Sequence, residues 1–87
     1  MGKIIFKDSK GNIHFGLNAP STDFKKAERK DVENTLSNLK SRKLWRCNAC
    51  RDLHINIEPP KQCPTCFVID AYVEIELNEF KRLLEIL

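Results

Sequence analysis

Apolar and polar residues alternate at the start of the chain, as they do in strands that bury one face. Ile4 and Phe6 alternate with lysines, and Ile13, Phe15 and Leu17 alternate with His14 and Gly16. Residues 8–12 (Asp-Ser-Lys-Gly-Asn) have turn composition, with a glycine that is free to take a positive φ. The pattern predicts a β-hairpin over residues 3–17 with one apolar face. His14 alternates with these apolar residues and is expected to face solvent, so we assign it no role.

Helical spacing follows the polar and proline-containing stretch 18–21. Ser21 or Thr22 can cap a helix that runs to about Ser41. Its apolar side, which we expect to pack on the hairpin, comprises Phe24, Ala27, Val32, Leu36 and Leu39. A break near residues 30–31, with Asp31 as a second cap, would instead give the paired helices of a helix-turn-helix. No Gly or Pro marks that break, and the pattern therefore favours a single helix.

Two short strands and a short helix are predicted in the second half of the chain. Alternation over residues 53–57 and 72–77 indicates the strands, and the outer face of the second carries Glu74 and Glu76. Asn78 can cap the final helix. Apolar residues recur on one side of that helix at i, i+3, i+4 and i+7, namely Phe80, Leu83, Leu84 and Leu87. Because so short a helix is unstable alone, it must dock on the domain or form a homodimer through those residues.

These elements define a small α+β protein. Its 87 residues suit one domain with an N-terminal β-hairpin, one main helix, a metal-binding ribbon of short antiparallel strands and a short C-terminal helix. We divide it into the hairpin and helix (1–44), the ribbon (45–77) and the amphipathic helix (78–87), and expect one compact unit. No apolar run is long enough to span a membrane, and we expect no membrane association.

All four cysteines lie in the ribbon, in two C-x-x-C pairs. Cys47 and Cys50 are separated from Cys63 and Cys66 by twelve residues. Each pair places two sulfurs inside one tight loop, and two facing loops supply the four thiolates of a tetrahedral zinc or iron site. Two disulfides are the alternative, but they require an oxidising compartment, and the chain starts with no apolar signal stretch. We therefore predict a metal site in a cytoplasmic protein.

A metal ion also suits a chain that can bury only a marginal core, because structural zinc contributes roughly 10–16 kcal/mol of apparent binding energy. His54 is the remaining candidate ligand. Since four cysteines already close the shell, we interpret His54 as a strand side chain or as a donor to a ligand. Trp45, two residues before Cys47, is expected to pack against the first loop.

Charge is distributed unevenly along the chain. Residues 1–51 contain twelve Lys and Arg against five Asp and Glu, a balance of +7, whereas residues 52–87 contain three against seven, a balance of −4. The densest run of cations, with no acidic residue among them, is Lys40, Arg42, Lys43, Arg46 and Arg51. Such a run is typical of a surface that contacts phosphates or a partner, and equally of a solvated helix end.

The ribbon resembles the rubredoxin-like module at the end of rubrerythrins. The matching positions, including the twelve-residue spacer, are Trp45, Cys47, Cys50, Leu53, His54, Glu58, Pro60, Cys63, Pro64 and Cys66. The resemblance covers residues 45–73 and implies a rubredoxin-like pair of metal-binding loops. Similar folds serve as electron-carrying iron sites and as structural zinc ribbons. The first half of the chain has no Glu-x-x-His and too little helix for the di-iron bundle of rubrerythrins, so their peroxidase chemistry is not implied.

The sequence departs from this family at three positions that bear on the metal. Glycine usually follows each loop, where a positive φ lets backbone N–H groups point at sulfur, but here the residues are Arg51 and Phe67. The aromatic residue usual two positions after the second cysteine is Asp52. Because those N–H donors tune an iron site, an altered geometry at Arg51 and Phe67 favours zinc over iron.

We therefore predict a non-catalytic zinc-ribbon protein that binds nucleic acid or a protein partner, with the cation run as its contact surface. The alternative is a one-electron carrier with a single iron on the same cysteines. The strand face that carries Glu74 and Glu76 would then be the docking surface for a redox partner. Trp45, Phe67 and Tyr72 could stack on bases, although their positions favour packing around the metal loops. A full thiolate shell leaves no open position for a substrate, so we expect no enzymatic activity.

Overall fold

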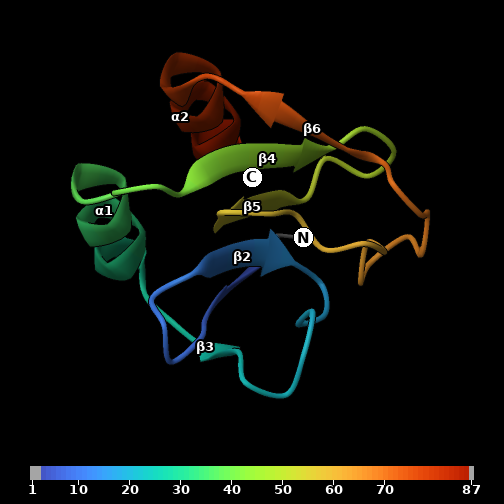
Figure 1. Cartoon of the computed structure of the whole chain (residues 1–87), viewed down its shortest axis with the longest axis horizontal. Helices are drawn as coiled ribbons and strands as arrows, with labels where there is room; N and C mark the ends of the chain where they lie inside the picture. The colour runs from blue at the N-terminus through green and yellow to red at the C-terminus, as the bar shows by residue number, and fades with distance from the viewer. Residues whose placement is uncertain (1–2, 87) are drawn as a thin grey trace.

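A six-stranded antiparallel sheet organises residues 3–86, the part of the chain that this computed structural model describes (Figure 1). The strand order is β3-β1-β2-β5-β4-β6. The strands are β1 (Ile4–Lys7), β2 (Ile13–Gly16), β3 (Lys25–Lys26), β4 (Lys43–Cys47), β5 (Leu53–Asn56) and β6 (Tyr72–Ile75). Two helices complete the described fold, α1 (Arg29–Ser37) and α2 (Leu77–Ile86). The predicted α+β class is confirmed, and one sheet runs through both the hairpin and the ribbon.

The predicted hairpin is formed by β1 and β2. The Asp8 carboxylate closes its turn by accepting hydrogen bonds from the backbone N–H groups of Lys10 (3.0 Å) and Asn12 (2.8 Å). Gly11 takes a φ of 89°, a conformation that glycine reaches without steric cost. The turn chemistry of residues 8–12 is therefore sufficient to place this hairpin.

The faces of the hairpin differ from the prediction. Phe6 lies directly opposite His14, and Ile5 lies opposite Phe15. Residues opposite one another in an antiparallel pair share a face, so Phe6 and His14 point to one side while Phe15 points to the other. The prediction of a single apolar face was wrong, because the apolar residues of β1 and β2 have opposite parity in the observed register. Both faces of the hairpin therefore carry buried side chains.

The prediction of a long helix over residues 22–41 was also wrong, both as a single helix and as a helix-turn-helix. Lys25 and Lys26 form a short edge strand on β1, and the Ala27 N–H donates to the Ile5 carbonyl at 2.9 Å. Helix α1 begins only after Glu28, whose backbone N–H donates a hydrogen bond to the Asp31 carboxylate at 3.0 Å. Pairing with an open sheet edge competes with local helix propensity and prevails here.

One face of the sheet, which we call the helical face, packs against both helices. Its buried strand residues are Ile13, Phe15, Leu44, Leu53 and Ile55. Val32 of α1 and Phe80, Leu83 and Leu84 of α2 join the same cluster. The helices lie on this face in Figure 1, with α1 near the start of β4 and α2 near β6. This cluster is the main hydrophobic core.

Helix α2 docks on the protein's own core. It begins one residue before the predicted cap Asn78, and its residues Phe80, Leu83 and Leu84 are at most 8% exposed. These side chains are therefore committed to the fold of a single chain, and Leu87, the fourth residue of the predicted dimer face, lies outside the described residues. Neither helix in residues 3–86 combines the length and the apolar character needed to cross a bilayer.

Candidate metal centre

Two tight loops, which we call the knuckles, carry the cysteines at one end of the sheet. The first knuckle (residues 47–52) links β4 to β5, and the second (residues 63–68) lies between β5 and β6. In the first knuckle the Arg51 N–H donates to the Cys47 carbonyl at 3.0 Å, and in the second the Phe67 N–H donates to the Cys63 carbonyl at 2.9 Å. The equivalent hydrogen bonds give the two loops the same backbone turn.

The four sulfurs converge as the C-x-x-C spacing predicts. All four cysteines are free thiols, and each Sγ lies within 4.8 Å of the other three. The Cys47 and Cys66 sulfurs are 3.7 Å apart, and the Cys50 and Cys63 sulfurs are 3.3 Å apart. Four thiolates around one ion at about 2.3 Å would be about 3.8 Å from one another. The donor set and its spacing fit a metal ion with four sulfur ligands.

Arg51 and Phe67 keep the backbone geometry that glycine usually supplies. Their φ angles are 66° and 65°, both left-handed. The expectation that these residues alter the knuckle geometry was therefore wrong. Each such conformation costs a non-glycine residue about 1–2 kcal/mol, so the turn itself overrides the local preference.

Backbone N–H groups point at the sulfurs as a consequence. The Asp52 N–H donates to Cys50, the Val68 N–H to Cys66, and the N–H groups of Thr65 and Cys66 to Cys63. Burial raises the pKa of Cys50 and Cys63, whereas the Val68 N–H lowers the pKa of Cys66. Since a metal binds thiolates, binding an ion here would release protons.

A second, smaller cluster of buried residues surrounds the sulfurs. Cys47, Cys63 and Tyr72 form its centre, and Trp45 packs against it as predicted. The Trp45 indole N–H also donates to the Asn56 carbonyl at 3.1 Å. Phe67, by contrast, is 64% exposed. Trp45 and Tyr72 are thus part of the structure around the sulfurs, whereas the Phe67 side chain is available to solvent.

Asp52 is the residue whose role the sequence did not reveal. It is completely buried, and its carboxylate forms an ion pair with Lys3 and accepts a hydrogen bond from the Thr65 hydroxyl at 2.5 Å. The Cys63 sulfur lies 3.6 Å from the same carboxylate. Burial opposes ionisation of Asp52, but contacts with His14, Lys3 and Thr65 lower its pKa below the usual range. The only sign of this in the sequence is a carboxylate where the resembling family carries an aromatic residue.

Asp52 also faces two buried histidines on the sheet face opposite the helices, which we call the polar face. His14 Nε2 lies 3.5 Å from the Asp52 carboxylate, and His14 Nδ1 lies 2.9 Å from Nδ1 of His54. His14 and His54 are 0% and 2% exposed. The prediction that His14 faces solvent was wrong, because the loop before β3 brings Phe24 over both imidazoles. His54 is a strand side chain, as predicted.

Gly16 makes room for this network. A Cβ at position 16 would overlap the Asp52 carboxylate and would lie 2.8 Å from His14 Nε2. Gly16 and His14 are two positions apart on β2 and therefore share the polar face. A glycine is required here for space.

The five cations of the predicted contact surface do not share one face of the sheet, although Lys40 and Arg42 line the same surface hollows. Lys43 and Arg46 are three positions apart on β4, and their side chains therefore point to opposite faces of the sheet. Arg42 is tied to the hairpin turn through the Asn12 side chain (2.9 Å) and the Lys10 carbonyl (2.5 Å). Arg46 forms an ion pair with Glu79 of α2 at 2.5 Å. Of the other two, Arg51 lies on the first knuckle and Lys40 follows α1 with a φ of 58°.

Comparisons with known proteins give no relative for this chain. No protein-family model matches it, and neither the curated proteins nor the solved structures contain a significant match. The functional assignment therefore depends on the site itself. Four cysteines positioned to bind a metal ion identify a candidate metal-binding module, in keeping with a rubredoxin-like or zinc-ribbon arrangement.

Proposed function

We propose that this protein is a non-catalytic interaction module in which one zinc ion, bound by Cys47, Cys50, Cys63 and Cys66, completes the fold. The convergence of the four sulfurs within 4.8 Å carries this proposal. A shell of four thiolates leaves no position for a substrate, which fits a structural role and not catalysis. The site also sits where an ion would hold much of the sheet in place, because Cys47 ends β4 and the second knuckle leads into β6.

Metal analysis tests this proposal directly. Protein produced with zinc and iron supplied in equal amounts is expected to contain one zinc per chain and to be colourless. Its circular dichroism should be lost on chelation and recovered on adding zinc, because binding energy at such sites is folding energy. A folded protein with no bound metal, or one that keeps its fold when stripped of metal, would refute the proposal.

A one-electron iron centre is the second candidate, and a specific observation favours it. The positive φ values at Arg51 and Phe67 preserve N–H donors to sulfur, which removes the argument against iron drawn from the absent glycines. Hydrogen bonds of this kind to the sulfurs are among the features that set the reduction potential of an iron–thiolate centre. Red protein that bleaches on reduction, with one iron per chain, would replace the zinc assignment by this one.

The exposed apolar residues beside the second knuckle favour a protein as the partner. Four of them define what we call the knuckle patch: Leu17, Phe67, Val68 and Ile69, which are 42–64% exposed. The Leu17 N–H donates to the Thr65 hydroxyl at 3.0 Å, which joins residue 17 to the second knuckle. Exposed apolar groups gathered at one place are typical of protein-binding surfaces. Lys43 and Arg46 point to opposite faces, and Arg46 is paired with Glu79, which weakens the case for the cation run as one nucleic-acid surface.

A matched pair of glycine substitutions separates binding from folding. Phe67→Gly and Arg51→Gly each relieve a left-handed φ, so both variants should be at least as stable as the wild type. Only Phe67→Gly removes an apolar side chain from the knuckle patch. In cross-linking of the whole protein in its native lysate, loss of one identified partner in Phe67→Gly but not in Arg51→Gly supports the protein-binding proposal. Equal capture by both variants, or capture of nucleic acid alone in a salt-sensitive manner, contradicts it.

A further inference from the structure

The two edges of the sheet differ in how well they are protected against further pairing. Strand β3 forms one edge with two exposed lysines, and a short, charged strand of this kind resists the addition of another strand. Strand β6 forms the other edge with four residues, among them Val73, which is 39% exposed. Figure 1 shows β6 at the outer edge of the sheet, next to β4. Within residues 3–86, β4 is the only strand paired with β6, so one side of β6 is open.

The hydrogen-bond pattern determines which backbone groups of β6 face its open side. In an antiparallel pair, residues that exchange hydrogen bonds alternate with residues that do not. The Asn48 N–H donates to the Ala71 carbonyl at 2.8 Å, and these two residues continue the register of β4 and β6. Alternation from this pair turns the N–H and C=O groups of Val73 and Ile75 toward β4 and those of Glu74 away from it. The open side therefore presents a backbone donor and acceptor that a further strand can pair.

The side chains give this edge an acidic character. Glu74 lies on the polar face, opposite Trp45 in the ladder, whereas Val73 lies on the helical face. Glu76, two positions further on, is also exposed. Glu74 forms an ion pair with Lys43 at 3.9 Å, but both side chains are about half exposed, and such a pair is weak. A strand placed beside β6 would thus meet carboxylates on one face and Val73 on the other.

A second copy of β6 fits this edge poorly. Among two-fold antiparallel pairings through the outward-facing groups, those with the most overlap are centred on residue 73 or on residue 74. The first brings Glu76 of one copy toward Asp70 of the other, and the second places Glu74 opposite Glu74. Like charges directly opposite one another destabilise a pair of strands, whereas opposite charges stabilise it. The acidic residues therefore favour a positively charged strand from another protein.

We infer that the open side of β6 binds an extended, positively charged segment of a protein partner, which adds to the sheet as a further antiparallel strand. Lys or Arg residues of that segment alternate with apolar residues, so that the cations meet Glu74 and Glu76 while the apolar groups meet Val73. Main-chain hydrogen bonds supply the affinity, and the alternating side chains supply the specificity. The inference rests on the proposed protein-binding function and gives it a second surface.

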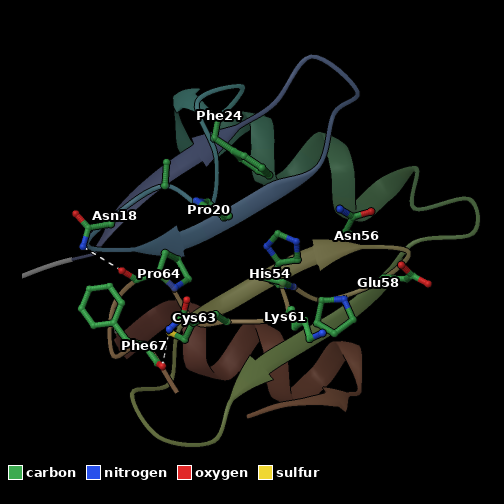
Figure 2. A pocket seen from close by; sticks show the side chains of 14 residues that line it. Asn18, Pro20, Phe24, His54, Asn56, Glu58, Lys61, Cys63, Pro64 and Phe67 are labelled. Carbon is green, nitrogen blue, oxygen red and sulfur yellow. Dashed lines mark hydrogen bonds between the residues drawn. The ribbon is translucent and has the colours of Figure 1, made fainter. Parts of the chain in front are cut away.

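This second surface is distinct from the knuckle patch. Figure 2 shows Phe67 beside a hollow of the polar face, together with Pro64, Phe24 and His54. The residues that line this hollow come from the ranges 18–24 and 54–67, both of which precede β6 in the chain. In the sheet, β5 lies on the other side of β4 from β6. Substitutions at Phe67 and in β6 therefore alter different surfaces.

Four short peptides test the inference on the metal-loaded full-length protein. The first alternates Lys with Val, and the second carries Glu in place of each Lys. The third and fourth are the Lys–Val peptide methylated on the backbone nitrogens of either the Lys or the Val residues.

Because a residue opposite Glu74 in the antiparallel pair exchanges both hydrogen bonds with it, methylation at Lys should abolish binding, and methylation at Val should leave it nearly unchanged. The Glu–Val peptide should bind roughly tenfold more weakly than the Lys–Val peptide, or not at all. Any other pattern of binding among the four peptides overturns the inference.

Amide hydrogen exchange of the wild-type protein tests the geometry without a variant. The Val73 and Ile75 amides should exchange slowly, whereas the Glu74 amide should exchange fast until the Lys–Val peptide slows it. Slow exchange at Glu74 in the dilute free protein would mean that this side of β6 is already covered. Exchange that slows with protein concentration alone would assign the edge to a second copy. Either result overturns the inference.

A matched pair of glutamate substitutions tests the charge requirement. Glu74→Gln should weaken binding of the Lys–Val peptide roughly twofold to fivefold, the effect of one opposite-charge pair, whereas Glu33→Gln at an exposed position of α1 should not. Equal weakening by both would show that only net charge matters and would contradict the inference. Zinc content and the comparison of Phe67→Gly with Arg51→Gly do not involve β6, so failure of this inference is distinguishable from failure of the proposed function.

Discussion

Both faces of the sheet contain fully buried side chains, but different interactions stabilise them. On the helical face, Ile13, Leu53 and Ile55 are fully buried among hydrocarbon, and burial of apolar area without directional requirements stabilises that core. On the polar face, His14 and Asp52 are just as inaccessible to solvent, yet they depend on directional hydrogen bonds, with His54 and with Thr65 respectively. Removing one partner from such a network leaves another buried polar group unpaired, so the polar face should be more sensitive than the helical face to the loss of a single polar group.

Loss of one sulfur ligand should have the largest effect, and it should act through the polar face. Cys63→Ser removes a thiolate and is expected to abolish stable folding, because roughly 10 kcal/mol of zinc-binding energy is comparable to the stability of a whole domain. Thermal unfolding followed by circular dichroism, together with zinc content, measures this. Thr65→Ser in the same knuckle is the matched control and should fold. A Cys63→Ser variant with wild-type Tm would show that the polar face does not depend on the sulfur ligands for its stability.

Truncation in the helical face should cost less and leave the metal untouched. Phe80 is fully buried and meets the Phe15 ring edge-on, with the two ring centroids 6.2 Å apart. Phe80→Ala is expected to lower the free energy of unfolding by about 3–5 kcal/mol through lost burial and a residual cavity. Urea unfolding with zinc in excess checks the value, and Phe80→Leu, which keeps most of the volume, should lose much less. If Phe80→Ala also weakens zinc affinity, the two faces are coupled more closely than proposed.

Gly16→Ala tests the steric requirement of the polar network. One methyl group would displace the Asp52 carboxylate and His14, an overpacking expected to cost about 1–3 kcal/mol. Because Asp52 also lies beside Cys63, zinc affinity in a chelator competition should fall as well. Gly11→Ala is the control, since its strain arises from a φ of 89° in the hairpin turn, away from the sulfurs, and should leave zinc affinity unchanged. Unaltered stability of Gly16→Ala would show that the network is loosely packed.

Acid should weaken the polar face selectively. Burial, reinforced by His14, lowers the pKa of His54 to about 3, against about 6.5 in an unfolded chain. The unfolded state therefore takes up a proton first, and the stabilisation present above pH 6.5 is lost as the pH falls from 6.5 toward 3. At pH 5 this loss is about 2 kcal/mol.

Comparison of wild type with His54→Leu in urea unfolding between pH 5 and 7.5 isolates the His54 contribution. The pKa values of Asp31 and Asp52 are also lowered, and their effect on stability has the same sign. It begins only below about pH 4, near the pKa of a free carboxyl group, and so lies outside this window. A difference between the two proteins that stays constant with pH would mean that His54 is protonated in the folded state.

Local patterns predicted those parts of the molecule that depend on nearby residues. The hairpin turn is determined by Asp8, Asn12 and Gly11, and the convergence of the sulfurs by the two C-x-x-C spacings. The amphipathic pattern of α2 correctly indicated a helix with one apolar side, but left open whether that side docks on the domain or forms a homodimer. Local patterns failed where a distant strand competed, because Lys25 and Lys26 pair with β1 although their surroundings have helical periodicity. They failed again at Arg51 and Phe67, where the turn imposes a conformation that side-chain preference alone would not choose.

The sequence by itself determined the ligand set of this protein, because the spacing of four cysteines fixes which sulfurs can share one ion. It also determined the α+β class, since short alternating segments and a strongly amphipathic C-terminal segment admit few other arrangements. Only the tertiary structure decided which side chains of each strand lie on the helical face and which on the polar face. A shift of one residue in the strand pairing would exchange the two sets without changing the sequence pattern. That choice brings Lys3, His14, Asp52 and His54 together across three separate segments, which no local pattern encodes.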